Sequence, residues 1–188
     1  EGEGAPRLEA PAVSFVRHAC SPLSGPLWIS VGMLLGWPED RAKGLVVFGG
    51  VYYKPRDAPD TAKPKRELCP ERAVEMGEYL RIFSEPRRFP AWSGVDWESR
   101  IVYEEEDVML VNKPSGVPAH ATVDNYRENM LASLRDTKAG LELSLPHRLD
   151  MDTSGLVIVA KRRETLRAIN DLIKEPGLLL KVIFYIIS

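Results

Sequence analysis

Cysteine is scarce in this sequence. Only Cys20 and Cys69 occur among 188 residues, and neither has a second Cys or His at the spacing of metal ligands. This excludes a zinc ribbon and a scaffold held together by disulfides, so we predict two free thiols in a reducing compartment and no bound metal. No glycine-rich loop of the kind that cradles phosphates occurs either, and we therefore predict no cofactor.

An excess of positive charge and a long apolar segment are also missing. The formal net charge is −2, so nucleic-acid binding would have to come from local patches. The most apolar run, Leu178 to Ser188, contains one charge, at Lys181, and is far shorter than the about 20 residues that cross a bilayer. It predicts a buried strand or a shortened end and no membrane association. No basic stretch with an apolar core opens the chain, so we expect no signal peptide.

What is present fits a globular protein with a core. Hydrophobic residues make up 44% and charged residues 28% of the sequence, enough for one large domain or two small ones. Residues 1–40 contain several Pro and Gly and show no sustained period, which predicts an irregular leader. Residues 86–97 combine Pro, Gly and Ser with two Trp, which is typical of a linker that packs on something.

Residues 41–90 predict a small domain. The apolar stretches 45–48 and 51–53 flank Gly49-Gly50, as in a strand pair or a helix end that turns into a strand. A basic loop, 54–66, carries five Lys or Arg, and residues 77–82 resume strand-like alternation. The order resembles a small ribosomal-protein-like RNA-binding domain of α/β type. A small β-rich domain without an RNA role is the alternative.

Residues 91–188 show a second organisation. An acidic run, 104–107, predicts a solvated turn, and the apolar stretch 108–111 predicts a strand. Apolar residues at three-to-five residue spacing predict a helix from Asp124 that ends before Gly140. The later elements are an apolar strand at 155–160, buried on both faces, and a helix at 163–174 with Leu166, Ile169, Leu172 and Ile173 inward.

The chemistry-bearing segment is Pro146-His147-Arg148-Leu149-Asp150-Met151-Asp152-Thr153-Ser154-Gly155-Leu156. It places a polar loop directly before an apolar strand, where a rigid scaffold can hold a reactive group. Together with an upstream block, Val111-Asn112-Lys113-Pro114-Ser115-Gly116-Val117-Pro118-Ala119-His120, it resembles the signature of the RluA-type RNA pseudouridine synthases. The resemblance covers about Ile101 to Ile173.

The resemblance implies the fold class α+β, a mainly antiparallel mixed sheet with flanking helices. It implies conversion of uridine to pseudouridine in rRNA or tRNA by a cofactor-free mechanism, with Asp150 as the nucleophile that attacks either the sugar or the uracil ring. A carboxylate suits this role because it is ionised at neutral pH and forms an ester-like adduct that can leave again. Since burial would raise its pKa, a neighbouring cation is required.

Other residues are assigned to RNA or to the loop. Arg148 projects to the same side as Asp150 if the segment is extended, and its guanidinium would fill the space of an extruded base. His147, Thr153 and Ser154 either position RNA or support the turn. Lys113 meets a phosphate or only solvent. The run Lys161-Arg162-Arg163 is a candidate backbone-contacting patch, or a solvated end of strand and helix.

One departure affects completeness. The family continues beyond Lys174 with a Lys-x-Tyr element and a basic partner for the Asp, whereas here Tyr185 is out of register after Lys181. We therefore expect an incomplete catalytic sheet, and an RNA-binding remnant is the alternative function. A carboxylate glycosidase would need two acids flanking the scissile bond, for which Asp150 and Asp152 are too close in sequence. We expect a monomer that works in cytoplasm, mitochondrion or plastid.

Overall fold

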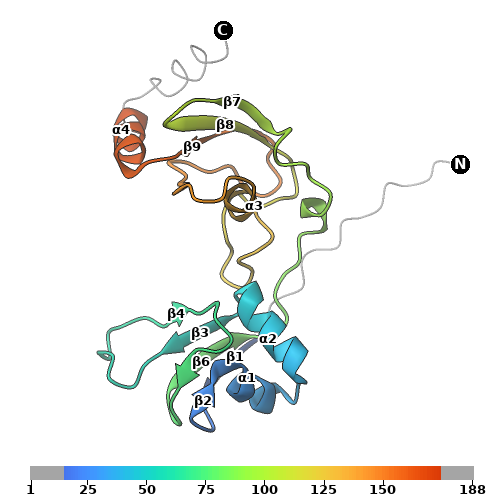
Figure 1. Cartoon of the computed structure of the whole chain (residues 1–188), viewed down its shortest axis with the longest axis vertical. Coiled ribbons are helices and arrows are strands. Elements are labelled where there is room, and N and C mark those ends of the chain that lie inside the picture. Colours follow the sequence, from blue (N-terminus) through green and yellow to red (C-terminus); the bar gives the residue numbers. More distant parts are fainter. Residues whose placement is uncertain (1–14, 175–188) are drawn as a thin grey trace, which may run out of the picture. The chain divides into compact units, whose positions relative to one another are not determined.

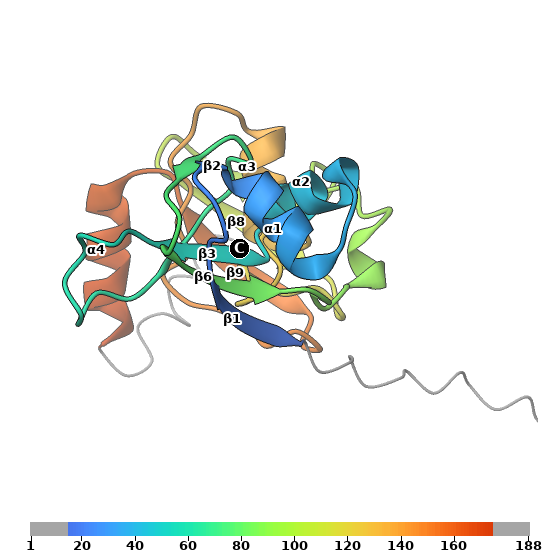
Figure 2. The ribbon, with the colours of Figure 1, turned by 90° about the horizontal axis from the view of Figure 1, so that it is seen from below.

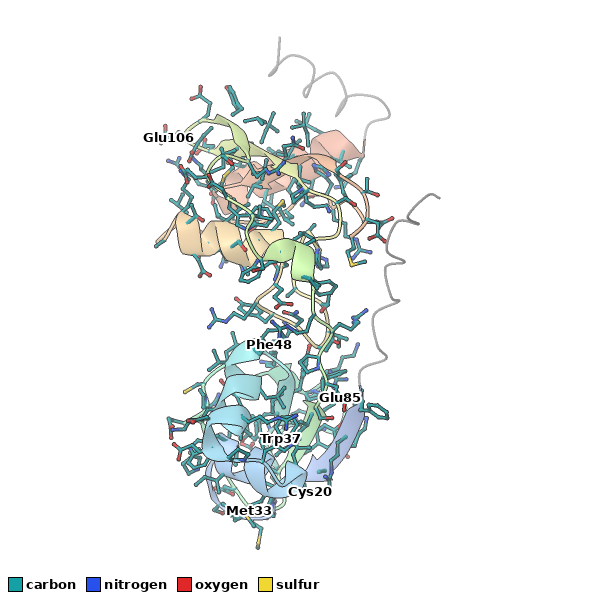
Figure 3. All side chains as sticks on the ribbon, turned by 90° about the vertical axis from the view of Figure 1, so that its right-hand side faces the viewer. Cys20, Met33, Trp37, Phe48, Glu85 and Glu106 are labelled. Carbon is teal, nitrogen blue, oxygen red and sulfur yellow. The ribbon has the colours of Figure 1, made fainter. Side chains whose placement is uncertain are left out.

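The computed structural model describes residues 15–174, which form two compact units. Within the described residues, the first unit comprises residues 15–88 with Val123–Asn125, and the second Phe89–Thr122 with residues 126–174. Within the described residues no helix is long and apolar enough to cross a membrane. Among the same residues, no three His, Cys, Asp or Glu side chains gather as metal ligands would. Cys20, labelled in Figure 3, and Cys69 are both free and exposed.

The first unit packs two helices against a four-stranded antiparallel sheet of order β1-β6-β3-β4 (Figure 1). Both helices lie on the same side of the sheet (Figure 2), and Val31 and Val46 share a buried cluster with Leu80 and Ile82. The elements are β1 (Val16–Cys20), β2 (Gly25–Pro26), α1 (Leu27–Leu35), α2 (Glu39–Phe48), β3 (Val51–Lys54), β4 (Lys65–Arg66), β5 (Ala73–Val74) and β6 (Tyr79–Phe83).

Part of the segment predicted as an irregular leader, residues 1–40, forms regular secondary structure. Residues 1–14 lie outside the described part, but β1 and α1 occupy much of the remainder. Helix α1 is apolar along almost its whole length, so it shows no polar face and no period in the sequence. Pro26 and Gly36, taken as signs of irregularity, stand at its two ends as N-cap and C-cap.

The Gly49-Gly50 pair confirms one of the two predicted alternatives, a helix end that turns into a strand. Helix α2 ends at Phe48, and Gly49 takes φ 88°, a left-handed conformation that side chains other than glycine rarely adopt. The Gly49 N–H donates to Leu45 O and Val46 O, and β3 starts two residues later at Val51.

The second unit is a three-stranded antiparallel sheet of order β7-β8-β9. Met109 and Val111 face α3 together with Val157 and Val159, and Met130 belongs to the same buried cluster. The elements are the 3₁₀-helix η1 (Pro90–Trp92), β7 (Ile101–Glu104), β8 (Val108–Lys113), α3 (Met130–Thr137), β9 (Gly155–Ala160) and α4 (Arg163–Ile173). The predicted strands at 108–111 and 155–160 are confirmed.

The linker and the acidic run also match their predictions. Phe89 and Trp97 are 5% and 7% exposed, so the segment 86–97 does pack on the core. Residues 104–106 are exposed at the turn between β7 and β8, where Figure 3 labels Glu106.

Helix α3 begins six residues later than predicted, at Met130. The preceding polar side chains bind backbone groups that a helix would not offer them: Glu128 Oε2 accepts from Phe89 N at 2.8 Å, and Asn129 Oδ1 accepts from Ala132 N at 2.9 Å. Asn129 is therefore the N-cap, and such local bonds favour a turn over a helix. The prediction of a helix start at Asp124 was wrong.

Helix α4 has the predicted start, but its apolar face is not buried. No residue of α4 is buried within the described part of the chain, and Leu172 is 36% exposed. An amphipathic pattern shows which residues share a face, but it does not show what covers that face. The inward placement predicted for Leu172 was therefore wrong.

Candidate active site

Antiparallel pairing explains why the two sequence blocks meet. In the register of β8 and β9, Lys113 at the end of β8 lies opposite Gly155 at the start of β9. The loop that leaves β8 and the loop that enters β9 therefore emerge at the same edge of the sheet. Two bonds join them directly: Gly116 N donates to Met151 O at 2.9 Å, and Ser115 Oγ donates to Asp152 O at 2.8 Å.

Lys113 is the internal support of this junction. Its side chain is fully buried, and Nζ donates to Pro114 O, Val117 O and Met151 O at 2.9, 2.7 and 3.0 Å. Three donated N–H bonds require the charged ammonium, since a neutral amine has only two. Burial lowers the pKa of Lys113, while the negative charges of Asp152 and Asp150 act to raise it.

Lys113 therefore cannot meet a phosphate or solvent, and that prediction is corrected. Met109, Leu110 and Val111 are buried in succession along β8, so no alternation in the sequence pointed to a buried Lys113. The buried side chain of Lys113 is a cation, and its partners are backbone carbonyls from the two loops.

His147 and Leu149 fix the segment that precedes Asp150. Ile158 N donates to His147 Nε2 at 3.0 Å, so His147 is a neutral acceptor at the edge of β9. Burial lowers the pKa of the half-buried His147, which favours the same neutral form. Leu149 packs against the core cluster of the second unit. Of the two roles considered for His147, the structure shows the support of the loop.

The alternating residues Arg148 and Asp150 are both exposed. With His147 and Leu149 directed inward, the segment presents the guanidinium and the carboxylate outward, as predicted for an extended run. Thr153 N donates to Asp150 O at 3.1 Å and closes a turn after the carboxylate. The side chains of Thr153 and Ser154 are exposed beside this turn.

Asp150 has a cation in its surroundings within the described residues. The Asp150 charge acts on the buried Lys113 ammonium, so the two are electrostatically coupled across the loop junction. The C-terminal elements with Lys181 and Tyr185 lie outside the described residues.

The cations of the run 161–163 are paired with carboxylates. Lys161 Nζ lies 2.6 Å from Glu104 Oε1, Arg162 Nε lies 3.0 Å from Asp107 Oδ1, and Arg163 Nε lies 3.3 Å from Glu142 Oε2. Arg162 also pairs with Glu106. The acidic turn between β7 and β8 thus neutralises much of the patch that the sequence offered to an RNA backbone.

The basic loop 54–66 of the first unit is partly engaged as well. Arg56 Nη2 donates to Met76 O at 2.6 Å and Lys54 Nζ donates to Asp60 O at 3.2 Å. In the same unit, the guanidinium of Arg41, on helix α2, lies 3.7 Å from the centre of the ring of Trp37, which precedes the helix.

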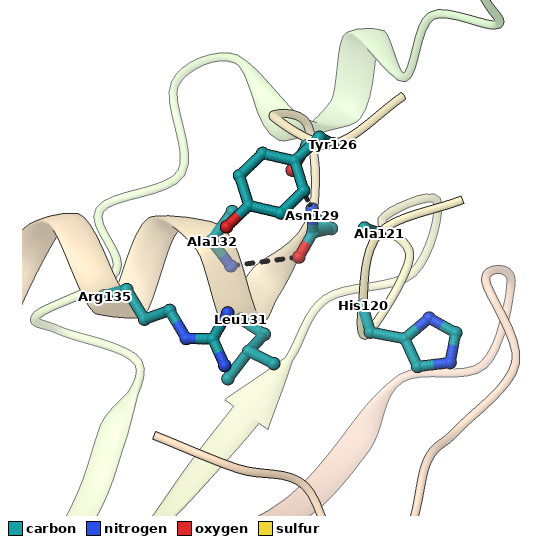
Figure 4. Close-up of a pocket in the computed structure, with 7 residues that line it drawn as sticks. All are labelled: His120, Ala121, Tyr126, Asn129, Leu131, Ala132 and Arg135. Atoms are coloured by element: carbon teal, nitrogen blue, oxygen red, sulfur yellow. Dashed lines mark hydrogen bonds between the residues drawn. The ribbon is translucent and has the colours of Figure 1, made fainter. Parts of the chain in front are cut away.

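Sequence reasoning missed the role of His120. Its Nε2 lies 3.3 Å from Arg148 Nη1, so the last residue of the upstream block contacts the exposed arginine of the loop. A second group of residues around Tyr126 lies next to it and forms a pocket (Figure 4). The contact between His120 and Arg148 could not be inferred from their spacing in the sequence, because the two residues meet only after β8 and β9 have paired.

A comparison with protein families finds similarity in the part of the chain that contains this loop junction. Residues 107–181 match the family described as RNA pseudouridylate synthase, a range that includes Lys113, His120 and Asp150. A solved structure, human RNA Pseudouridylate Synthase Domain Containing 4, is similar at 25% sequence identity with a TM-score of 0.35, covering 42% of this chain and 30% of that chain.

The names of curated relatives describe pseudouridine synthases. Ribosomal large subunit pseudouridine synthase C of Escherichia coli (strain K12) is 37% identical over 123 residues, 61% of this chain and 38% of the relative. RNA pseudouridine synthase 6, chloroplastic, of Oryza sativa subsp. japonica is 28% identical over 118 residues, 62% of this chain and 24% of the relative. This chain thus spans well under half the length of these relatives. Residues 107–181 are thus similar to the RNA pseudouridylate synthase family, and the two relatives named here are pseudouridine synthases.

Proposed function

We propose that this protein isomerises uridine to pseudouridine in RNA, with Asp150 as the nucleophile. The observation that supports the proposal is the exposed Asp150 at the junction of the two sequence blocks, between His147, which accepts from Ile158 N, and Met151, whose carbonyl accepts from Lys113 Nζ. In the reaction the N1–C1′ glycosidic bond breaks, the uracil turns, and a C5–C1′ bond forms. The C5 hydrogen leaves as a proton and N1 gains one, so no cofactor is consumed. Asp150 forms a transient bond to the ribose or to the ring and leaves again.

Arg148 supplies the second part of the mechanism. A target base has to leave the stack, at a cost of a few kcal/mol. Arg148 stands outward beside Asp150, and a planar guanidinium stacks on bases while it bonds phosphates. It fills the space of the extruded uridine and thereby offsets part of that cost.

Ribosomal RNA is the substrate favoured by the names of the bacterial relatives, and transfer RNA is the other candidate. The first unit adds affinity as a small RNA-binding domain. Its support is the stack of Arg41 on Trp37 and a second stack of Arg88 over Phe48 at 5.2 Å, a combination that binds unpaired bases and phosphates. We expect the protein to act as a monomer.

The test uses rRNA and tRNA labelled with tritium at C5 of uracil, in separate arms, with the whole chain. We expect label release from wild type and from Asp152→Ala, and none from Asp150→Ala. Asp152 is the matched control, because it is an exposed carboxylate of the same loop whose contact to Ser115 is made by its backbone oxygen.

Two outcomes contradict the proposal in different ways. Equal release from all three proteins removes Asp150 from the reaction. No release from any of them, with RNA still bound, favours the alternative of a catalytically incomplete RNA-binding remnant.

A further inference from the structure

The sheet of the first unit has one face that its two helices do not cover. Both helices lie on the other side (Figure 2), where Leu80 and Ile82 pack in the buried cluster. Because successive side chains of a strand point to opposite faces, Arg81 between them points to the uncovered face. The register places His18 of β1 and Tyr52 of β3 opposite Arg81. We call this surface the open face and define it by the side chains that share this direction: His18, Tyr52, Lys54, Arg66, Tyr79 and Arg81.

The strands of the open face carry positive charge and no carboxylate. None of the residues in β1, β3, β4 and β6 is Asp or Glu, whereas Lys54, Arg66 and Arg81 are cations. The whole chain has a formal net charge of −2, and the cations of the run 161–163 are paired with acids. The open face is therefore a local basic patch, which attracts a polyanion although the chain as a whole does not.

The guanidinium of Arg81 is held in place, but one of its donors is unsatisfied. It lies 4.4 Å from the centre of the Tyr52 ring and 5.6 Å from the centre of the Phe83 ring. Such contacts use the flat face of the guanidinium and leave the N–H groups at its edge for acceptors. Within residues 15–174, Arg81 Nε is shielded from solvent and has no hydrogen-bond acceptor. A buried donor without an acceptor costs free energy, so a ligand that brings an acceptor oxygen to this edge is favoured.

A hollow of about 350 Å³ lies at one end of the open face, where Lys54 pairs with Tyr79 in the strand register. Arg56 also lines this hollow, and Asp60 is the carboxylate of the lining. Lys54 Nζ donates to the backbone oxygen of Asp60 at 3.2 Å, so its hydrogen-bond partner is a neutral carbonyl. The hollow thus adds two cations and one acid to the patch.

The opposite end of the open face is covered within the same unit. Tyr52 OH donates to Val123 O at 2.8 Å, and Phe83 is 5% exposed. His18 lies on the edge strand β1 and is exposed. A ligand therefore reaches Arg81 from the side of His18 and the hollow.

Phosphate groups match these donors. An arginine can bind a phosphate through two parallel N–H···O bonds, and cations on neighbouring strands suit a backbone that carries a charge at every nucleotide. Tyr79 OH and His18 Nδ1 already share a hydrogen bond, so the cations are the groups left for a ligand. An acidic peptide would offer carboxylates to the same cations, but the second unit is similar to a family of enzymes that act on RNA, which favours RNA as the polyanion.

We propose that the open face binds phosphate groups of an RNA strand, with Arg81 and Lys54 as its main contacts. It is a second RNA-binding surface of the first unit, separate from the stack of Arg41 on Trp37 on the helical side. The inference rests on the proposed function for the choice of RNA, but binding at this face does not require the reaction. Contacts to phosphates position a strand without reading its sequence.

The experiment measures the affinity of a fluorescent single-stranded RNA of about ten nucleotides by anisotropy, over a series of salt concentrations. The parent is the whole chain carrying Asp150→Ala, which prevents chemistry. Arg81→Met keeps the length of the side chain and removes its charge, and we expect about a ten-fold loss of affinity at low salt. The slope of the logarithm of affinity against the logarithm of salt concentration should fall by about 0.7, the value for one phosphate contact on a single strand.

Lys65→Met is the matched control. Lys65 is an exposed cation of the same sheet, and its partner in the register, Tyr53, packs on the helical side, so the slope should change less. If circular dichroism shows that Arg81→Met does not fold, Lys54→Met takes its place, because it alters a flexible side chain at the end of β3 and should lower the slope in the same way.

Three results would overturn the proposal. They are equal slopes for the parent and for the folded variants of Arg81 and Lys54, an equal loss in Lys65→Met, and no measurable binding by the parent. Poly-glutamate is the probe for an acidic protein partner, and we expect it to bind the parent and Arg81→Met alike. If its binding depends on Arg81 while RNA binding does not, the open face serves an acidic protein instead. Label release from wild type is scored separately, so a failed reaction and a failed binding surface are distinguishable.

Discussion

Replacing the buried lysine with an isosteric apolar residue, Lys113→Met, should destabilise the second unit and displace the Asp150 loop. Three hydrogen bonds from a charged donor contribute roughly 4–9 kcal/mol together, whereas keeping the ammonium out of water costs several kcal/mol. Their difference gives an expected loss of about 2–4 kcal/mol in the free energy of unfolding. The largest local effect falls on the carbonyl of Met151, the residue next to Asp150, which loses the bond from Lys113 Nζ and retains the bond from Gly116 N.

The assay is urea unfolding followed by circular dichroism, together with label release from tritiated RNA. Lys174→Met is the matched control, because Lys174 is 74% exposed on its side chain and pairs only with Asp171 in the described structure. Exposed pairs of this kind contribute little. If Lys113→Met unfolds at the same urea concentration as Lys174→Met, the ammonium does not support the junction. If it unfolds earlier but releases label at the wild-type rate, the junction does not position Asp150.

Two further perturbations test the loop edge and the first unit. Burial lowers the pKa of His147 from 6.5, so the unfolded chain takes up the proton first and the free energy of unfolding should fall as the pH drops below about 6.5. His147→Gln can still accept from Ile158 N and should lose this pH dependence in unfolding experiments at pH 7.5 and 5. If the variant keeps the same dependence of stability on pH, His147 is not a neutral acceptor. In the first unit, Arg41→Ala should weaken RNA binding and reduce the slope of the logarithm of affinity against the logarithm of salt concentration by about one. Lys43→Ala is the control and should change the affinity less, because this lysine is already paired with Glu39 and Glu71. Equal effects of the two variants would argue against a role of the Arg41–Trp37 stack.

The sequence was informative where a local rule dominates. The apolar runs 108–111 and 155–160 predicted the strands β8 and β9, because a strand buried on both faces needs no alternation. Gly49 marked the end of α2, since few residues other than glycine take a left-handed conformation there. The motif around Asp150 predicted that Arg148 and Asp150 project to the same side of an extended segment, and both side chains are exposed.

Local rules failed where partners come from elsewhere in the chain. The start of α3 moved to Met130 because Glu128 and Asn129 bind backbone groups, one of them at Phe89. Helix α1 was missed because a helix that is apolar nearly throughout has no visible period. For α3 the deciding contact is distant in sequence. For α1 the uniformly apolar sequence hides the helical period.

By itself, the sequence determined the polar loop around Asp150 and the two strands, 108–111 and 155–160, next to it, because residue type and period act over a few neighbours. Only the tertiary structure decided what those residues touch. The pairing of Lys113 with Gly155 across two strands brings the buried lysine to Met151 O and His120 to Arg148, with a pocket that His120 lines. The physical reason is that an antiparallel register joins residues some forty positions apart at a single edge, and no local pattern in the chain encodes that register.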